Sequence, residues 1–298
     1  MYSYKNGNAL ISIYNDGTRI VEFENKLNLE YPLNIDIRVS TQCSFGQKED
    51  GSSGFCTFCH ESAKTNGKEC DYEVLKKKLE NLPSGIELAI GGNNITESLI
   101  LFLTWCYHKG FICNLTVNQG HLNKYQKELR LLINNGLIKG LGVSYRKPLK
   151  WDIPNFILNY ENTVFHVIAG IDNIEDIISL SKKGVNKVLI LGEKDFGYNL
   201  GKVNLESKNH KHWRWYLMSI LKSFNIVSFD NLALEYLKPQ RYMSESSFLT
   251  FNQGEHSMYI NAVEGYYSPS SRSNIKTSWG NIDLKDFFIN KENTIDNL

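Results

Sequence analysis

Long uninterrupted apolar stretches are missing from this chain of 298 residues. No window approaches the run of about 18 apolar residues that marks a membrane-spanning helix. The first residues, MYSYKNGNALISIYNDG, also lack the basic flank, apolar centre and small-residue cleavage site of a secretory leader. We therefore expect a cytoplasmic protein that does not contact a membrane.

An excess of charge of either sign is missing too. Lys and Arg total 33 against 32 Asp and Glu, which gives a formal net charge of +1. This balance supplies no overall field that would attract a nucleic acid or an anionic membrane. Locally, the run HKHWRWY at 210–216 interleaves cations and aromatic rings as nucleic-acid grooves do. Helical spacing explains the run as well, so a nucleic acid is the weaker alternative. The inward side of that helix would carry Trp213, Tyr216, Leu217 and Ile220.

Cysteine is absent after residue 113. The six cysteines stand at positions 43, 56, 59, 70, 106 and 113. A disulfide framework distributes its cysteines along the chain, so this clustering favours a reducing compartment and a metal site. Cys70, Cys106 and Cys113 belong to no motif, and we expect them to be buried as small apolar residues.

The apolar residues that are present alternate in a pattern typical of an α/β protein. Residues 8–24 predict a hairpin, because two alternating apolar runs flank Asn15-Asp16-Gly17. Short apolar strands then alternate with amphipathic helices, which predicts a parallel sheet. The six strands are expected at 35–40, 86–90, 111–117, 138–144, 163–169 and 187–191. Asp71, Thr96, Asn123 and Asn173 are the expected helix caps.

These elements predict a partial (β/α)6 TIM-like barrel, with an N-terminal β-hairpin and an α+β C-terminal extension. The extension should contain a helix at 210–223, a strand at 226–229, a short helix NLALEYL and two antiparallel strands near 247–251 and 256–263. The expected domain bounds are 1–33 for the hairpin, 34–200 for the barrel core and 201–298 for the extension that closes it.

Three cysteines follow the first parallel strand, in the order Cys43-x12-Cys56-x2-Cys59. Loops at the C-terminal ends of barrel strands are where such folds place their chemistry. Thiolates select iron–sulfur clusters or zinc, and three of them leave one iron of a four-iron cluster without a protein ligand. Structural zinc is the alternative, with His60 or Cys70 as the fourth ligand.

The run Cys56-Thr57-Phe58-Cys59-His60-Glu61 resembles the second half of the motif of radical S-adenosylmethionine (SAM) enzymes, in which an aromatic residue precedes the third cysteine. The usual spacing in that family is three residues and then two, whereas the first gap here is twelve. The resemblance implies a [4Fe–4S] cluster bound by Cys43, Cys56 and Cys59. Cys70 is the replacement if Cys43 is not a ligand.

Later segments extend the resemblance. IELAIGGNN at 86–94 is similar to the family's Gly-Gly-Glu strand, with Asn in place of the acid, and LTVNQG at 115–120 is similar to its third strand. The resemblance implies that the SAM-binding residues are Phe58, Gly91, Gly92, Asn93, Asn118, Ser144 and Leu191. Taken alone, the two glycines could instead form a turn with positive φ, and the polar residues could cap helices.

The resemblance also implies a mechanism. SAM would bind at the open iron and be cleaved reductively to methionine and a 5′-deoxyadenosyl radical, with electrons from a small flavodoxin or ferredoxin-type protein. The similarity is closest to proteins encoded by bacteriophages, so the expected substrate is a nucleotide, a modified base or a small metabolite. The catalytic candidates, which lie near strand ends, are Tyr145, Arg146, His166 and Lys194. The alternatives are a non-catalytic iron–sulfur or zinc protein and an enzyme that uses SAM as a methyl donor.

Overall fold

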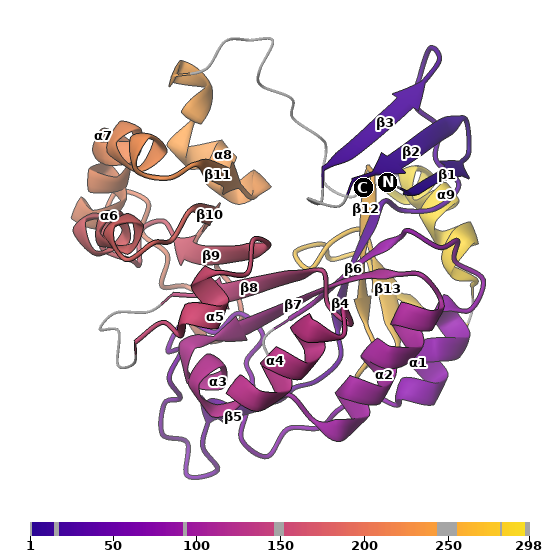
Figure 1. The fold of residues 1–298 in the computed structure, drawn as a ribbon, viewed down its shortest axis with the longest axis horizontal. Helices are drawn as coiled ribbons and strands as arrows, with labels where there is room; N and C mark the ends of the chain where they lie inside the picture. The colour runs from indigo at the N-terminus through magenta and orange to yellow at the C-terminus, as the bar shows by residue number, and fades with distance from the viewer. Residues whose placement is uncertain are drawn as a thin grey trace.

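The structure is a computed structural model that describes residues 2–14, 18–91, 94–145, 152–242, 255–280 and 282–295. It is an α/β protein with two sheets (Figure 1). A three-stranded antiparallel sheet lies at the N-terminus, and a mixed ten-stranded sheet forms the rest of the molecule.

The N-terminal sheet consists of β1 (Tyr2–Asn6), β2 (Ala9–Ile13) and β3 (Arg19–Phe23). Its last two strands confirm the predicted hairpin, whose turn lies outside the described residues, and β1 is an additional strand. Ile11 is fully buried, and Arg19 forms an ion pair with Glu87 of the large sheet at 2.6 Å. The hairpin is therefore joined to the main body by both packing and charge.

All six predicted strands are present and parallel in the large sheet. They are β4 (Asn34–Arg38), β6 (Glu87–Ile90), β7 (Ile112–Asn118), β8 (Gly140–Ser144), β9 (Thr163–Ile168) and β10 (Lys187–Leu191). They lie side by side in chain order. The strand β11 (Ile226–Phe229) adds to β10 in parallel and forms one edge of an open sheet.

The other edge comes from the C-terminal segment and differs from the prediction. The strand β12 (Ser257–Asn261) pairs in parallel with β4, whereas the other predicted strand, near 247–251, lies outside the described residues. Its antiparallel neighbour is β13 (Tyr266–Ser268), which follows a turn at Gly265 and leads to β14 (Thr277–Ser278). One sheet thus contains strands from both the predicted core and the predicted extension.

Helices follow the lower and left border of the sheet in Figure 1. Predicted caps are confirmed for α1 (Tyr72–Leu79) at Asp71, α2 (Glu97–His108) at Thr96 and α6 (Ile174–Lys182) at Asn173. Asn123 is not a cap, because it lies inside a helix that begins earlier. The remaining helices are α3 (Gln119–Lys124), α4 (Gln126–Asn134), α5 (Asn155–Leu158), α7 (Lys208–Ser223), α8 (Asn231–Leu237) and α9 (Leu284–Ile295).

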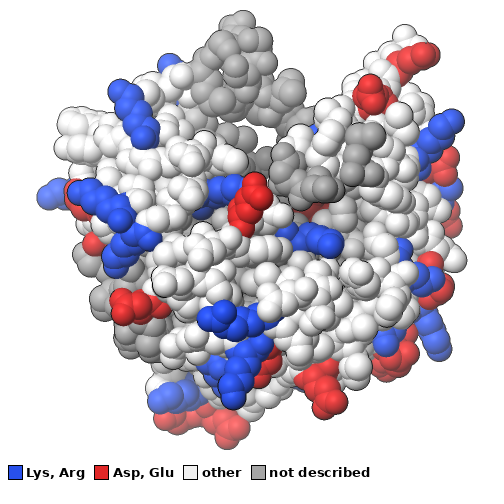
Figure 2. All heavy atoms as spheres, viewed as in Figure 1, with Lys and Arg blue, Asp and Glu red and all other residues white. Residues whose placement is uncertain are grey.

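The core lies between these helices and one face of the large sheet. Leu115 and Val117 of β7, like Phe165 and Val167 of β9, are buried there, while the residues between them face the other way. Alternate side chains of a strand point to opposite faces, so the second face is free to line a cavity. None of the helices in the described ranges has the length and apolar character to cross a bilayer. Lys, Arg, Asp and Glu side chains are interspersed over the face in Figure 2.

The helix α7 confirms most of the predicted inward residues. Trp213, Leu217 and Ile220 are fully buried. Tyr216 is 45% exposed, against the prediction, because it lies at the edge of the helix face whose centre the other three occupy.

Candidate functional site

The long loop between β4 and α1 carries Cys43, Cys56 and Cys59. Within it, the strand β5 (Gln42–Gln47) is followed by a chain reversal in which Lys48 N donates to Ser52 O at 3.1 Å and Phe55 N donates to Phe45 O at 2.8 Å. The twelve residues between the first two cysteines therefore fold back on themselves. We call this folded-back segment, residues 44–55, the closed excursion, because its two ends are adjacent.

The second half of the loop returns along β5. Gln47 N donates to Ala63 O at 2.9 Å, and Lys64 N donates to Thr41 O at 3.0 Å. This close approach of two backbones requires glycine at position 46, where a Cβ would lie 2.5 Å from Ala63 O. The glycines of the loop are thus needed for its packing.

Side chains from two other elements fix the loop in place. The ring of Phe45 covers Gly120 of α3, and His121 Nε2 lies 3.7 Å from Cys43 Sγ. From the segment after β10, the hydroxyl of Tyr198 lies 2.9 Å from Gln47 Oε1 and 3.0 Å from Ser62 O. Contacts on both sides therefore position the thiols relative to the sheet.

The three cysteines line one cavity of about 330 Å³, a size typical of small-molecule sites. Ten of the fourteen residues that the sequence predicts for the site line this cavity: Cys43, Cys56, Phe58, Cys59, Gly91, Asn118, Ser144, His166, Leu191 and Lys194. Gly92, Asn93 and Arg146 lie outside the described residues. The structure thus brings together residues separated by more than 150 positions in the sequence.

Tyr145 is the exception, because its side chain is buried in the core and does not line the cavity. Ser144 precedes it at the end of β8 and faces the cavity, so the alternation along the chain turns Tyr145 to the helix side. Burial raises the pKa of Tyr145 to about 12. In this structure Tyr145 is therefore apart from the other predicted site residues.

The alternative explanations for two SAM-binding candidates can be compared with the structure. Gly91 does not have a positive φ, and a Cβ placed on it would meet no described atom within 4 Å. Protein packing therefore gives no reason for glycine here. Asn118 does cap a helix, since its Oδ1 accepts from His121 N at 2.8 Å, but its side chain also lines the cavity.

The three thiols are donors of the type that an iron–sulfur cluster requires. None of them forms a disulfide. Burial, reinforced by Cys56 and Cys59, raises the pKa of Cys43 to about 11, which opposes the thiolate form that a metal binds. Backbone N–H groups of Phe45 and Gly46 donate to the Cys43 sulfur, a contact of the kind that tunes cluster ligands. Within the described ranges, no three or more His, Cys, Asp or Glu side chains are gathered to hold a metal ion. A four-iron cluster spreads its thiolates more widely than one ion does, because each binds a different iron.

The other cysteines lie away from this cavity. Cys70, Cys106 and Cys113 are buried members of the hydrophobic core, as predicted, and none of them lines the cavity. Cys70 N donates to Val39 O at 2.8 Å, which fixes the end of the loop to the sheet. Cys70 is therefore poorly placed to replace Cys43 as a ligand.

The same cavity has a charged end, of which Asp36 and Arg38 were not predicted from the sequence. We define it as Asp36 and Arg38 of β4, Glu61 after the third cysteine, and Lys194 after β10. Arg38 Nε and Glu61 Oε2 form an ion pair at 2.7 Å, and Arg38 also donates to Glu61 O at 2.5 Å. Burial alone would raise the pKa of Glu61, but His60 and the charge of Arg38 outweigh it and lower the pKa to about 2. Glu61 is thus ionised and paired.

Asp36 has a different environment. Its carboxylate lines the cavity and has no hydrogen-bond or ion-pair partner in the described part of the chain. Burial raises the pKa of Asp36 to about 6, although the charge of Lys194 acts in the opposite direction. The sequence signal was present, because Asp36, Arg38 and Ser40 alternate with apolar residues in the first strand.

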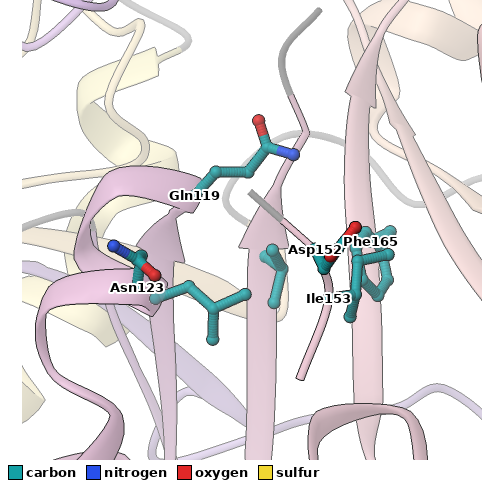
Figure 3. Close-up of a pocket in the computed structure, with 7 residues that line it drawn as sticks. Gln119, Asn123, Asp152, Ile153 and Phe165 are labelled. Atoms are coloured by element: carbon teal, nitrogen blue, oxygen red, sulfur yellow. The ribbon is translucent and has the colours of Figure 1, made fainter. Parts of the chain in front are cut away.

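A second cavity lies on the helix side of β8, against α3. Gln119, Asp152, Ile153 and Phe165 surround it (Figure 3). Its volume of about 10 Å³ is close to the minimum for one water molecule, so it offers no room for a substrate. Of these two cavities, the larger is therefore the candidate site.

Comparison with known proteins adds no assignment to this geometry. No model of a protein family matches the chain, and no match is found among curated proteins.

Proposed function

We propose that the chain is a radical SAM enzyme in which Cys43, Cys56 and Cys59 bind a [4Fe–4S] cluster. The observation that carries the proposal is the closed excursion between Cys43 and Cys56, which brings the three thiols to one cavity despite their spacing. Three thiolates would leave one iron free of protein ligands. When bound, the cluster and SAM supply the reductive cleavage to methionine and a 5′-deoxyadenosyl radical.

We also propose that the strands β4 to β10 act as a partial (β/α)6 barrel around this cavity. Each of the six strands contributes a cavity residue at or next to its C-terminal end. These residues are Arg38, Gly91, Asn118, Ser144, Ile168 and Leu191. Catalytic residues of barrel enzymes come from such strand ends, so this arrangement supports a catalytic role over a purely structural one.

The residues of the chain would then have distinct tasks. The thiols and the backbone N–H groups of Phe45 and Gly46 would hold the cluster, and Gly91 would leave room for SAM beside it. Phe58 and Leu191 would provide apolar walls. The cavity wall would also keep water from a reactive intermediate, and a small electron-donor protein would supply the electron.

The test is cofactor content and product analysis on protein purified without oxygen. The full chain is expected to contain about four irons with matching sulfide, and to convert SAM to 5′-deoxyadenosine and methionine under strong reductant. Alanine at position 43, 56 or 59 should abolish both results, while Cys70→Ala, a matched control, should keep them. Gly91→Val should retain iron but bind SAM at least about tenfold more weakly, because its side chain fills the open space.

Each rival has its own outcome. A single zinc without sulfide would contradict the proposal, as would full iron content in Cys43→Ala. Formation of S-adenosylhomocysteine without 5′-deoxyadenosine would instead identify a methyltransferase.

A further inference from the structure

The charged end of the cavity contains two groups of opposite sign, Asp36 and Lys194, that form no ion pair with any residue the structure describes. Asp36 has no hydrogen bond or ion pair in the described ranges. Lys194 Nζ makes one polar contact there, with Ser271 Oγ at 3.5 Å, and lies 5.6 Å from the centre of the Phe196 ring. The two charges interact, since Lys194 acts on the Asp36 carboxyl, but they do not form an ion pair within 4 Å. Both groups line the same cavity.

Other charged groups of the cavity do have ion-pair partners, as the neighbouring Arg38 and Glu61 show. Arg38 and Glu61 are joined by two contacts, at 2.7 and 2.5 Å, and their charges are satisfied within the protein. A ligand would gain little from either of them. Asp36 and Lys194 are the charged groups at this end that have no ion-pair partner among the described residues.

The space beside Asp36 is open on one side. In the sheet register, Asp36 lies between Ala89 of β6, a small residue, and Tyr259 of β12, a large one. Farther along, the ring of His166 packs over Gly142, where a Cβ would come within 2.5 Å of it, so this ring borders the cavity. The side chain of Asp36 is exposed to the cavity, so its carboxylate is accessible to a ligand, and charged groups in such positions are typical of binding sites.

We propose that Asp36 and Lys194 form a substrate subsite for a small zwitterion, with a cationic nitrogen at Asp36 and an anionic oxygen at Lys194. Calling the ligand a substrate rests on the proposed function, whereas the pair as a binding site does not. A zwitterion satisfies both groups at once, and a singly charged molecule leaves one of them desolvated without a partner. The subsite thus selects by charge pattern, and the distance between the two charges sets the length of the ligand.

Straight-chain ω-amino acids, from glycine to 6-aminohexanoate, serve as probes of that length. Binding to the full chain is measured by calorimetry or ligand-observed NMR, without iron or SAM. For each length, the unbranched amine and the unbranched carboxylate are the singly charged references. One length is expected to bind at least about tenfold more tightly than both of its references.

Two substitutions connect this preference to the subsite. Asp36→Asn and Lys194→Met should each abolish it, because each removes one charge and keeps the shape of the side chain. Glu206→Gln and Lys208→Met remove the same charges from exposed positions outside the cavity and should leave the preference unchanged. Circular dichroism of each variant checks that the fold is retained.

The outcomes separate this subsite from the proposed function. The inference is overturned when no length is preferred over its references, or when the preference survives both substitutions. A preference without 5′-deoxyadenosine formation keeps the subsite and removes the radical SAM assignment. Formation of 5′-deoxyadenosine without a preferred ligand length would keep the radical SAM assignment and remove the subsite.

Discussion

Asp36 is a charged residue in a parallel strand whose adjacent side chains are apolar and buried. Its neighbours Ile35 and Ile37 are buried, as expected in a parallel sheet covered by helices. Asp36 itself faces the cavity, where burial raises the pKa of its carboxyl. A charge in this position weakens the fold, so its retention is best explained by function.

The pKa of Asp36 leads to a stability prediction. The pKa of the carboxyl is about 6 in the folded chain, against an ordinary value of 3.8, so the folded state binds more protons between these two pH values. Stability therefore falls as pH rises through this window and stays lower above it. Asp36→Asn should raise the unfolding free energy at pH 8 by on the order of 1 kcal/mol, a value kept small because the cavity hydrates the carboxylate.

Urea unfolding at pH 8 and at pH 4.5 measures this effect. The variant should be more stable than the parent chain at pH 8, and the difference should be clearly smaller at pH 4.5. An equal difference at both values would mean that the carboxyl has an ordinary pKa.

At the scale of single elements, the cysteine loop is the part that the sequence predicted least completely. Its position after the first strand and its glycines were visible in the sequence. Its closure depends on hydrogen bonds between residues 10 to 23 positions apart, such as Phe55 with Phe45 and Lys64 with Thr41. Tyr198 and Phe45 then fix it against distant elements. No local pattern contains these contacts.

Gly46→Ala tests the packing of this loop. The added methyl group would lie 2.5 Å from Ala63 O, and both atoms belong to backbones that cannot move independently. We expect a local cost of about 1–3 kcal/mol, so that the amide hydrogens of Gln47 and Phe55 exchange faster and reconstituted protein binds less iron. Ser53→Ala, at an exposed position of the same loop, should change neither. Unchanged exchange at Gln47 and Phe55 would show that the two backbones separate without cost.

Regular elements were predicted well where their signals are local. The parallel strands follow apolar runs, and Asp71, Thr96 and Asn173 cap their helices as predicted. The predicted start of the third helix, at Asn123, was too late, because the helix is capped by Asn118. Asn118 both caps this helix and lines the cavity, and the sequence alone does not show that one residue has two roles.

For the molecule as a whole, the feature that the sequence could not supply is the position of the C-terminal segment. An extension that closes the barrel was expected, but its parallel pairing with β4 was not. Strand pairing across more than 200 residues depends on which edge of the sheet remains free, and sequence patterns do not encode that. The pairing brings Tyr259 and Ser271 to the cavity wall.

The two outer regions of the large sheet should differ in their contribution to stability. Ile260 of β12 is fully buried, whereas Ile226 of β11 is 48% exposed. Ile260→Ala should lower the unfolding free energy by about 3 kcal/mol, and Ile226→Ala by less than about 1 kcal/mol. Chemical unfolding of the two variants gives the comparison. Similar losses would indicate that β12 is not part of the cooperative core.

The closed excursion in the cysteine loop separates chain length from thiol geometry. Its stem is fixed by Phe45 and Phe55, while its turn, around Lys48 and Ser52, lies at exposed or half-buried positions. Lengthening or shortening the turn leaves the stem, and hence the sulfur atoms, where they are. This turn is accordingly the natural point at which to insert an affinity tag or a fluorescent reporter beside the cavity.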